Sequence, residues 1–260
     1  LLAAAGDNGH WEGQLCSSAL STATAVSALA IAHKHGENGA ISSAAREDRL
    51  RIDQGLRWLL GQQNPDGGWG DTDKSYSNIA TTMLVVAAFQ LSGDAASRPR
   101  VVERARAYIG EQGGLAGLRQ RYGKDKTFAV PILTNYALAG LADWSEVSPL
   151  PFELACVPQR LYRWTRMPVV SYAIPALVAI GQARFFHRPP RLPWMRLVRQ
   201  WARGPSLEVL QRMQPASGGY LEAVPLTSFV VMSLAAAGNR EHPVVEKGLA
   251  FIRDSLRPEG

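Results

Sequence analysis

The sequence has little of what builds disulfide frameworks or metal sites. Only two of its 260 residues are cysteine, Cys16 and Cys156. They are too few and too far apart for a disulfide framework, which is consistent with a reducing compartment. No cysteine pair has the spacing of a zinc site, and His33 and His35 would point in different directions from a helix. We therefore expect neither a metal nor a cofactor.

Long apolar runs and strand patterns are also missing. The longest uncharged apolar run, residues 168–183, contains two prolines and is short for a membrane span. The other apolar segments are rich in alanine and leucine with helical spacing, which predicts an all-α protein. Neither a Gly-x-Ser-x-Gly turn nor a phosphate-binding loop is present. These absences indicate a helical protein that is soluble or lies on a membrane and has no nucleotide chemistry.

Acidic residues and lysine are absent between Glu153 and Glu208. This stretch holds nine arginines, at positions 160, 163, 166, 184, 188, 191, 196, 199 and 203. The whole chain has a net charge of +6, so the rest of it carries −3. The positive charge is therefore concentrated in one segment.

Aromatic and aliphatic residues alternate with these arginines, and four of them share one helical face: Trp194, Leu197, Val198 and Trp201. A basic helix with an aromatic edge is typical of proteins that lie in an anionic lipid surface. On this interpretation the membrane contacts are Phe185, Phe186, Trp194, Arg196, Leu197, Arg199 and Trp201. A solvated basic face over two core tryptophans explains the pattern equally well. Nucleic-acid binding is disfavoured, because no recognition motif accompanies the charge.

One stretch, residues 54–69, suggests how the chain is organised. Its first part is an apolar helix end, and Asn64-Pro65-Asp66-Gly67-Gly68 then forms a turn signal before Trp69. Proline ends the helix and the glycines let the chain reverse, so the indole of Trp69 can lie over the helix end near Gln63. We expect this tryptophan to act structurally.

The same pattern, a glycine-containing turn followed by an aromatic residue, recurs along the chain. Asp7-Asn8-Gly9-His10-Trp11 precedes one long apolar helix, and residues 214–220 end on Tyr220 before another. The repeat predicts stacked helical hairpins. Expected helices cover residues 18–35, 44–62, 77–91, 99–112, 127–141, 169–183, 193–202, 206–213, 226–237 and 243–256, and residues 1–16 are expected to be a helix end and turn.

These residues resemble the QW repeat of squalene-hopene and oxidosqualene cyclases. The first copy stands as Gln54-Gly55, Trp58-Leu59, Gln63, Gly67 and Trp69, and the others involve Trp11, Gln214, Gly218 and Tyr220. The resemblance implies an incomplete α/α toroid from the N-terminal part of a class II triterpene cyclase. Residues 1–14 would form the edge of a neighbouring catalytic barrel, and residues 15–260 an inserted α/α-barrel domain truncated at its C-terminal end.

The resemblance also implies which residues line a substrate cavity. Leu15, Cys16 and Thr24 fall at cavity positions of the family's entry repeat, and Thr24 replaces a glutamate. Lys126 and Phe128 resemble its Arg-x-Phe, and Tyr172 its second wall aromatic. Ala223-Val224-Pro225 resembles Ile-Gln-Pro, with Val224 in place of a glutamine. Ordinary helix packing is the alternative role for each of these residues.

The family's acid motif, Asp-x-Asp-Asp, does not occur in the chain. Asp71-Thr72-Asp73-Lys74 comes nearest, but Lys74 replaces the last aspartate, and its position after Trp69 predicts an exposed, capped turn. No catalytic residue is therefore expected here, and the isolated chain is expected to be inactive.

The resemblance implies an isomerase that cyclises a linear C30 isoprenoid after protonation, as a peripheral protein on the cytoplasmic face of the cell membrane. Its partners would be the isoprenoid and an anionic membrane surface, with a homodimer left open. Two alternatives remain: a prenyltransferase-type α/α-toroid subunit, which would need a zinc site, and a non-catalytic helical module that binds lipid or protein.

Overall fold

The structure is a computed structural model that describes residues 16–35, 43–123, 126–158, 162 and 173–257. Every regular element in these ranges is a helix, and none of the described residues forms a strand. The predicted all-α fold class is therefore confirmed. The expected helix end and turn at residues 1–16 falls almost wholly outside the described residues.

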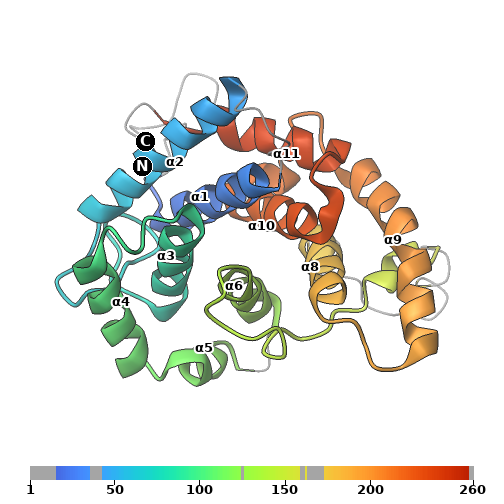
Figure 1. The fold of residues 1–260 in the computed structure, drawn as a ribbon, viewed down its shortest axis with the longest axis horizontal. Coiled ribbons are helices and arrows are strands. Elements are labelled where there is room, and N and C mark those ends of the chain that lie inside the picture. Colours follow the sequence, from blue (N-terminus) through green and yellow to red (C-terminus); the bar gives the residue numbers. More distant parts are fainter. Residues whose placement is uncertain (1–15, 36–42, 124–125, 159–161, 163–172, 258–260) are drawn as a thin grey trace, which may run out of the picture.

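Five inner helices form a ring (Figure 1). Each contacts the next in the order α1, α3, α6, α8 and α10, and α10 returns to α1. Their bounds are α1 Ala19–Lys34, α3 Ile79–Ser92, α6 Lys126–Leu138, α8 Ile174–His187 and α10 Val224–Leu234. These segments are apolar around nearly their whole circumference, which is typical of helices covered on all sides.

A second layer surrounds this ring. It consists of α2 Ser43–Gly61, α4 Pro99–Glu111, α5 Gly114–Tyr122, α9 Pro193–Met213 and α11 Pro243–Asp254. Most of these outer helices are amphipathic, with buried residues on the side that faces the ring. Short helices η2 (Phe152–Cys156), η4 (Tyr220–Glu222) and η5 (Ala235–Asn239) join them. Two concentric helical layers are the arrangement of an α/α toroid, as the sequence predicts.

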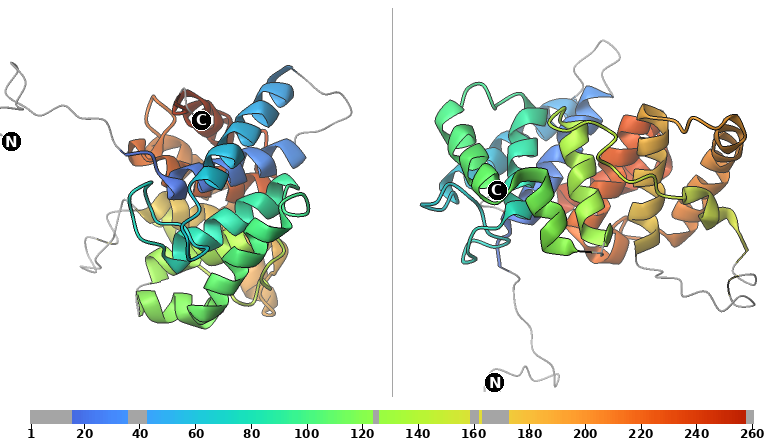
Figure 2. Two further views of the ribbon diagram at one scale, coloured as in Figure 1. Left: turned by 90° about the vertical axis from the view of Figure 1, so that its left-hand side faces the viewer. Right: turned by 90° about the horizontal axis from the view of Figure 1, so that it is seen from below.

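The inner helices lie alongside one another and begin at the same end of the ring (Figures 1 and 2). At the end where they begin, the amide of Asp73, before α3, donates to the carbonyl of Ser17, before α1, over 3.2 Å. At the other end, Arg240 donates to the carbonyl of Ala32 near the end of α1 over 3.0 Å. These two ends of the ring are called the N-terminal end and the C-terminal end below.

Arginine side chains cover several helix ends at the C-terminal end. Besides the bond to α1, Arg49 donates to the carbonyl of Ser92 in α3 over 3.1 Å, and Arg203 to that of Ala237 after α10 over 3.3 Å. The last carbonyls of a helix lack partners within it and carry partial negative charge. The basic residues therefore stabilise the layers as well as giving the chain its charge.

The turn at residues 64–68 folds as its sequence predicts. The indole of Trp69 is fully buried, and its Nε1 donates to the carbonyl of Leu59 over 2.8 Å. The side-chain amide of Gln63 donates to the carbonyls of Gly67 at 2.9 Å and Val101 at 3.0 Å. The aromatic ring thus holds α2 against α3, and the glutamine joins the turn to α4.

The turn at residues 214–220 repeats this pattern bond for bond. The hydroxyl of Tyr220 donates to the carbonyl of Leu210 over 2.9 Å. The amide of Gln214 donates to the carbonyls of Gly218 at 2.9 Å and Val244 at 3.0 Å. Two copies of the sequence pattern therefore build the same joint between an outer helix, the next inner helix and the outer helix after that.

Two features of the helices differ from the expectation. Residues 114–122 form α5, where the sequence shows two glycines and predicts no helix. Gly117 permits it, because a Cβ there would lie 1.7 Å from the carbonyl oxygen of Gln112. The predicted break at Gly204-Pro205 is wrong, since α9 continues through Pro205. Gln182 supports α9 there by donating to the carbonyl of Arg203 over 3.0 Å.

Candidate functional site

The N-terminal end of the ring gathers most of the described residues that the sequence predicts for a cavity. Cys16 precedes α1 and is exposed, Phe128 lies in the first turn of α6, and Val224 begins α10. Ala223 and Pro225 flank Val224 and are half-buried. Because inner helices begin together at this end, residues more than 200 positions apart lie on one face of the molecule.

Phe128 is the aromatic side chain best placed for contact with a ligand. It is 58% exposed and stacks on Tyr122 at the end of α5, with ring centroids 5.8 Å apart. Burial raises the pKa of Tyr122, so its phenol stays neutral at physiological pH. Lys126 is the first residue of α6, but its side chain, like all of Leu15 and Tyr172, lies outside the described residues.

Thr24 does not reach this end of the ring. Its side chain is fully buried within α1, and its hydroxyl donates to the carbonyls of Leu20 at 3.0 Å and Ser21 at 2.9 Å. A threonine in the middle of a helix commonly bonds to its own preceding turn in this way. The described structure therefore places Thr24 in the packing between α1 and its neighbouring helices.

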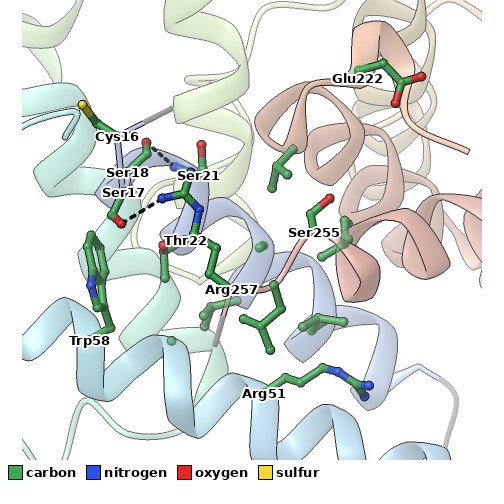
Figure 3. Close-up of a pocket in the computed structure, with 17 residues that line it drawn as sticks. Cys16, Ser17, Ser18, Ser21, Thr22, Arg51, Trp58, Glu222, Ser255 and Arg257 are labelled. Carbon is green, nitrogen blue, oxygen red and sulfur yellow. Dashed lines mark hydrogen bonds between the residues drawn. The ribbon is translucent and has the colours of Figure 1, made fainter. Parts of the chain in front are cut away.

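A pocket of about 310 Å³ opens beside the start of α1. It is lined by residues before and within α1, by α2, and by the end of α11 (Figure 3). Cys16 and Val224 lie at its wall, but Phe128 does not. The guanidinium of Arg257 donates to the hydroxyl of Ser17 over 3.3 Å inside it, and Glu222 points away from the other labelled side chains.

The acidic turn between Trp69 and α3 has a structural role. Asp71 is exposed. Its carboxylate accepts hydrogen bonds from the side-chain amide of Asn78, over 2.8 Å, and from the hydroxyl of Thr81. Its carbonyl accepts from the hydroxyl of Ser18 over 2.8 Å. The prediction of an exposed, capped turn is therefore confirmed, and its carboxylate supports the beginnings of α1 and α3.

An exposed apolar stripe follows one face of α9. Trp194, Leu197 and Trp201 are 60%, 72% and 70% exposed, and Val198 lies beside them. Arg196 is exposed on the same helix, and half of Phe186 is accessible at the end of α8. The single helical face predicted from the sequence is therefore present, and its aromatic rings point outward instead of forming core.

Two residues predicted for this surface are buried, and that part of the prediction is corrected. Phe185 packs against Phe152, with ring centroids 6.0 Å apart. Arg199 forms an ion pair with Glu153 over 3.2 Å and stacks over the ring of Phe152. Helical periodicity explains the difference, because Arg199 lies on the opposite side of α9 from Trp194 and Trp201.

Sequence reasoning missed Tyr122, which supports Phe128 at the N-terminal end. No helix was expected where α5 lies, so nothing in the pattern placed the two rings together. Among the described residues no group of three potential metal ligands occurs. Within the same residues, no helix is both long and apolar enough to cross a membrane.

Comparison with known proteins decides the family. Residues 1–179 match the squalene-hopene cyclase N-terminal domain. The chain belongs to this family. Its fold of inner and outer helices and its relation to triterpene cyclases are therefore as the sequence predicts.

Individual relatives agree with this assignment. Squalene hopane cyclase afumA of Aspergillus fumigatus is 30% identical over 174 residues, covering 64% of this chain and 21% of that protein. Cycloartenol synthase of Dictyostelium discoideum is 35% identical over 107 residues, covering 41% of this chain and 14% of that protein. Alpha-onocerin synthase LCD of Lycopodium clavatum is 27% identical over 168 residues, covering 63% of this chain and 20% of that protein. The chain thus spans about a fifth or less of the length of these relatives.

Proposed function

We propose that this chain is the N-terminal portion of a squalene-hopene cyclase-like enzyme and forms one wall of its substrate cavity. The complete protein would convert a linear C30 isoprenoid into a polycyclic triterpene by protonation and carbocation cyclisation. The acid would come from another part of that protein. We also propose that the two turns at residues 63–69 and 214–220 are QW repeats of the family.

The observation that supports this proposal most directly is the meeting of family-implied cavity positions at one end of the ring. Cys16, Phe128 and Val224 belong to three different inner helices or their beginnings, yet all lie at the N-terminal end. Phe128 remains more than half exposed there, although a phenylalanine of an inner helix would ordinarily be buried. An open aromatic wall suits a surface that another part of the protein covers.

This wall would stabilise the positive charge of carbocation intermediates in a cavity that excludes water. The face of an aromatic ring attracts a cation through its quadrupole. Phe128 can offer such a face, and Tyr122 holds its ring by stacking. An apolar enclosure also protects a carbocation from premature capture by water. Val224 stands where the family has a polar side chain, so this wall would hold fewer water molecules.

The proposal is tested in the complete enzyme by replacing Phe128 with alanine. We expect a changed distribution of cyclised products from squalene, because an unstabilised intermediate is released or deprotonated earlier. Phe186→Ala is the matched control, since Phe186 is similarly exposed at the opposite end of the ring. The 260-residue chain alone should give no cyclised product. Product from it, or an unchanged distribution from Phe128→Ala, would contradict the proposal.

We further propose that the exposed stripe on α9 rests on an anionic membrane surface at the cytoplasmic face of the cell membrane. The stripe of Trp194, Leu197, Val198 and Trp201 is apolar, and the segment around it has no acidic residue. Tryptophan rings favour the boundary between headgroups and acyl chains, and each nearby arginine adds attraction to anionic lipid. This geometry would bring the enzyme to the bilayer that holds its apolar substrate.

A further inference from the structure

The connection that leads into α10 is much shorter than its counterpart before α3. Nine residues, 70–78, separate Trp69 from the start of α3, whereas three residues, 221–223, separate Tyr220 from the start of α10. Both connections begin alike, because each aromatic residue donates its backbone amide to the hydroxyl of a threonine in the helix that follows, over 2.9 and 3.0 Å. The second connection must therefore turn into its helix within three residues.

Two of these three residues adopt a backbone conformation that L-residues with a side chain disfavour. Leu221 has a φ of 54° and a ψ of 23°, and Glu222 has a φ of 51°. They are the only non-glycine residues of the described chain with a positive φ. The conformation is unfavourable because Cβ comes close to the following carbonyl oxygen. Strain of this kind persists only where the surrounding structure holds it in place.

Hydrogen bonds on both sides hold the strained residues. Tyr220 before them is buried and is bound through its backbone amide and its hydroxyl. The two backbone amides after Leu221 donate to the carbonyls of Gly219 and Tyr220, over 3.2 and 3.1 Å. The carboxylate of Glu222 accepts from the hydroxyl of Ser217 over 2.6 Å, which keeps its charge beside the turn. The backbone therefore cannot relax at Leu221 without breaking these bonds.

The strained backbone leaves an apolar side chain in the open. Leu221 is 63% exposed, and it stands two residues before the predicted wall positions 223–225 at the N-terminal end of the ring. The corresponding residue after Trp69 is Gly70, which is buried and has no side chain. A Cβ there would lie 2.3 Å from the carbonyl oxygen of Ser75. Only the connection into α10 thus presents an aliphatic group at this position.

We propose that Leu221 contacts the substrate in the complete enzyme and helps to determine the length of isoprenoid that it accepts. This role rests on the proposed function, in which this end of the ring forms one wall of the cavity. A leucine side chain offers aliphatic surface without charge or hydrogen-bonding groups, as the walls of apolar ligand sites do. Its rigid backbone gives the contact a fixed position, and a fixed contact discriminates between chains of different length.

Competition between two substrates of the complete enzyme tests the proposal. Leu221→Ala should raise kcat/KM for an isoprenoid one unit longer than squalene, relative to squalene, by about tenfold, because the lost methyl groups leave room. Leu221→Gly should change this selectivity in the same direction without lowering Tm, because glycine adopts a positive φ without strain. Leu50→Ala is the matched control. Leu50 is also 63% exposed but lies on α2, so its variant should keep the wild-type selectivity.

Three other outcomes would overturn the proposal. If the wild type cyclises squalene and both Leu221 variants keep its selectivity, Leu221 does not contact the substrate, and the proposed function stands. If both variants lower Tm and keep the selectivity, Leu221 instead packs against another part of the protein. If the complete wild-type protein cyclises no linear isoprenoid, the proposed function fails, and the role of Leu221 fails with it.

Discussion

Asp48 and Arg253, which are 205 residues apart in the chain, form a two-bond ion pair that joins α2 to α11. The guanidinium donates to the two carboxylate oxygens over 2.8 and 2.6 Å, and Asp48 is nearly inaccessible to solvent. The hydrogen bond to Asp48 is the main cause that raises the pKa of Arg253. The first and last outer helices of the described chain are therefore fastened to each other.

Replacing Asp48 with asparagine should destabilise the protein by about 3 kcal/mol, because a guanidinium that is mostly buried loses its counter-charge. Asp53→Asn is the control. Asp53 pairs with Arg49 at 3.6 Å on the same helix, but both side chains are substantially exposed, so the loss should be below about 1 kcal/mol. Urea unfolding measures both values. Equal losses of unfolding free energy from the two variants would mean that the ion pair of Asp48 and Arg253 does not fasten α2 to α11.

The side-chain hydrogen bonds of Trp69 and Tyr220 should contribute similar free energies to stability. Trp69→Phe and Tyr220→Phe each keep a ring but remove the donor to a buried carbonyl, that of Leu59 or Leu210. Each change should cost about 1–3 kcal/mol, because the carbonyl is left without its partner. Trp201→Phe on the exposed face of α9 should cost less than about 0.5 kcal/mol. Chemical denaturation would show whether the two hydrogen bonds are equivalent.

Stability should decrease as the pH falls below about 6.5. His187 stacks on Trp144 with ring centroids 4.4 Å apart, and burial is the first cause that lowers its pKa, followed on the lowering side by the charge of His35. A lowered pKa in the folded state means that the unfolded chain binds the proton more readily. The stability is therefore complete above the unfolded pKa and is lost as the pH falls towards the folded one.

The variant His187→Phe keeps a ring on Trp144 but cannot bind a proton. Its free energy of unfolding should change less between pH 7 and pH 5 than that of the wild type, by no more than about 1.4 kcal/mol per pH unit. Burial also lowers the pKa of His242, so some dependence should remain. An unchanged slope in denaturation curves over this range would exclude His187 as a contributor.

Two arginines of α9 should behave in opposite ways. Arg196→Gln, on the exposed side, should weaken sedimentation with anionic vesicles by a few fold and leave stability nearly unchanged, since one surface charge contributes about 1 kcal/mol. Arg199→Gln should lower stability by about 3 kcal/mol, because Glu153 loses its buried partner. Its vesicle binding should remain. Neutral vesicles serve as the control, and binding that ignores Arg196 and Trp194→Ser alike would contradict attachment through α9.

The sequence predicted the ring because its strongest signals are local. Proline and glycine at residues 65–68 dictate a turn, and the aromatic residue after them has a buried site beside the helix that has just ended. The same pattern at Tyr220 gave the same joint. The uniformly apolar segments then became inner helices, and the amphipathic ones became outer helices.

The sequence could not predict features that depend on distant contacts. Arg199 and Arg196 are indistinguishable by composition, but Arg199 is buried against Glu153 of another element and Arg196 is exposed. Where α9 continues through Pro205, the carbonyl of Arg203 accepts a hydrogen bond from Gln182, which lies on another helix. Likewise, the partner of Phe128 belongs to α5, a helix of nine residues with glycines at two of its positions. Local propensity argues against such a helix, and packing forms it.

The hydrogen bond between Ser17 and Arg257 brings the two ends of the described chain side by side. A unit whose two ends lie together can be grafted into an exposed turn of a host protein without stretching either partner. It can also exchange its ends, so that a permuted chain opened at a distant surface turn and joined across this point would still close the same ring.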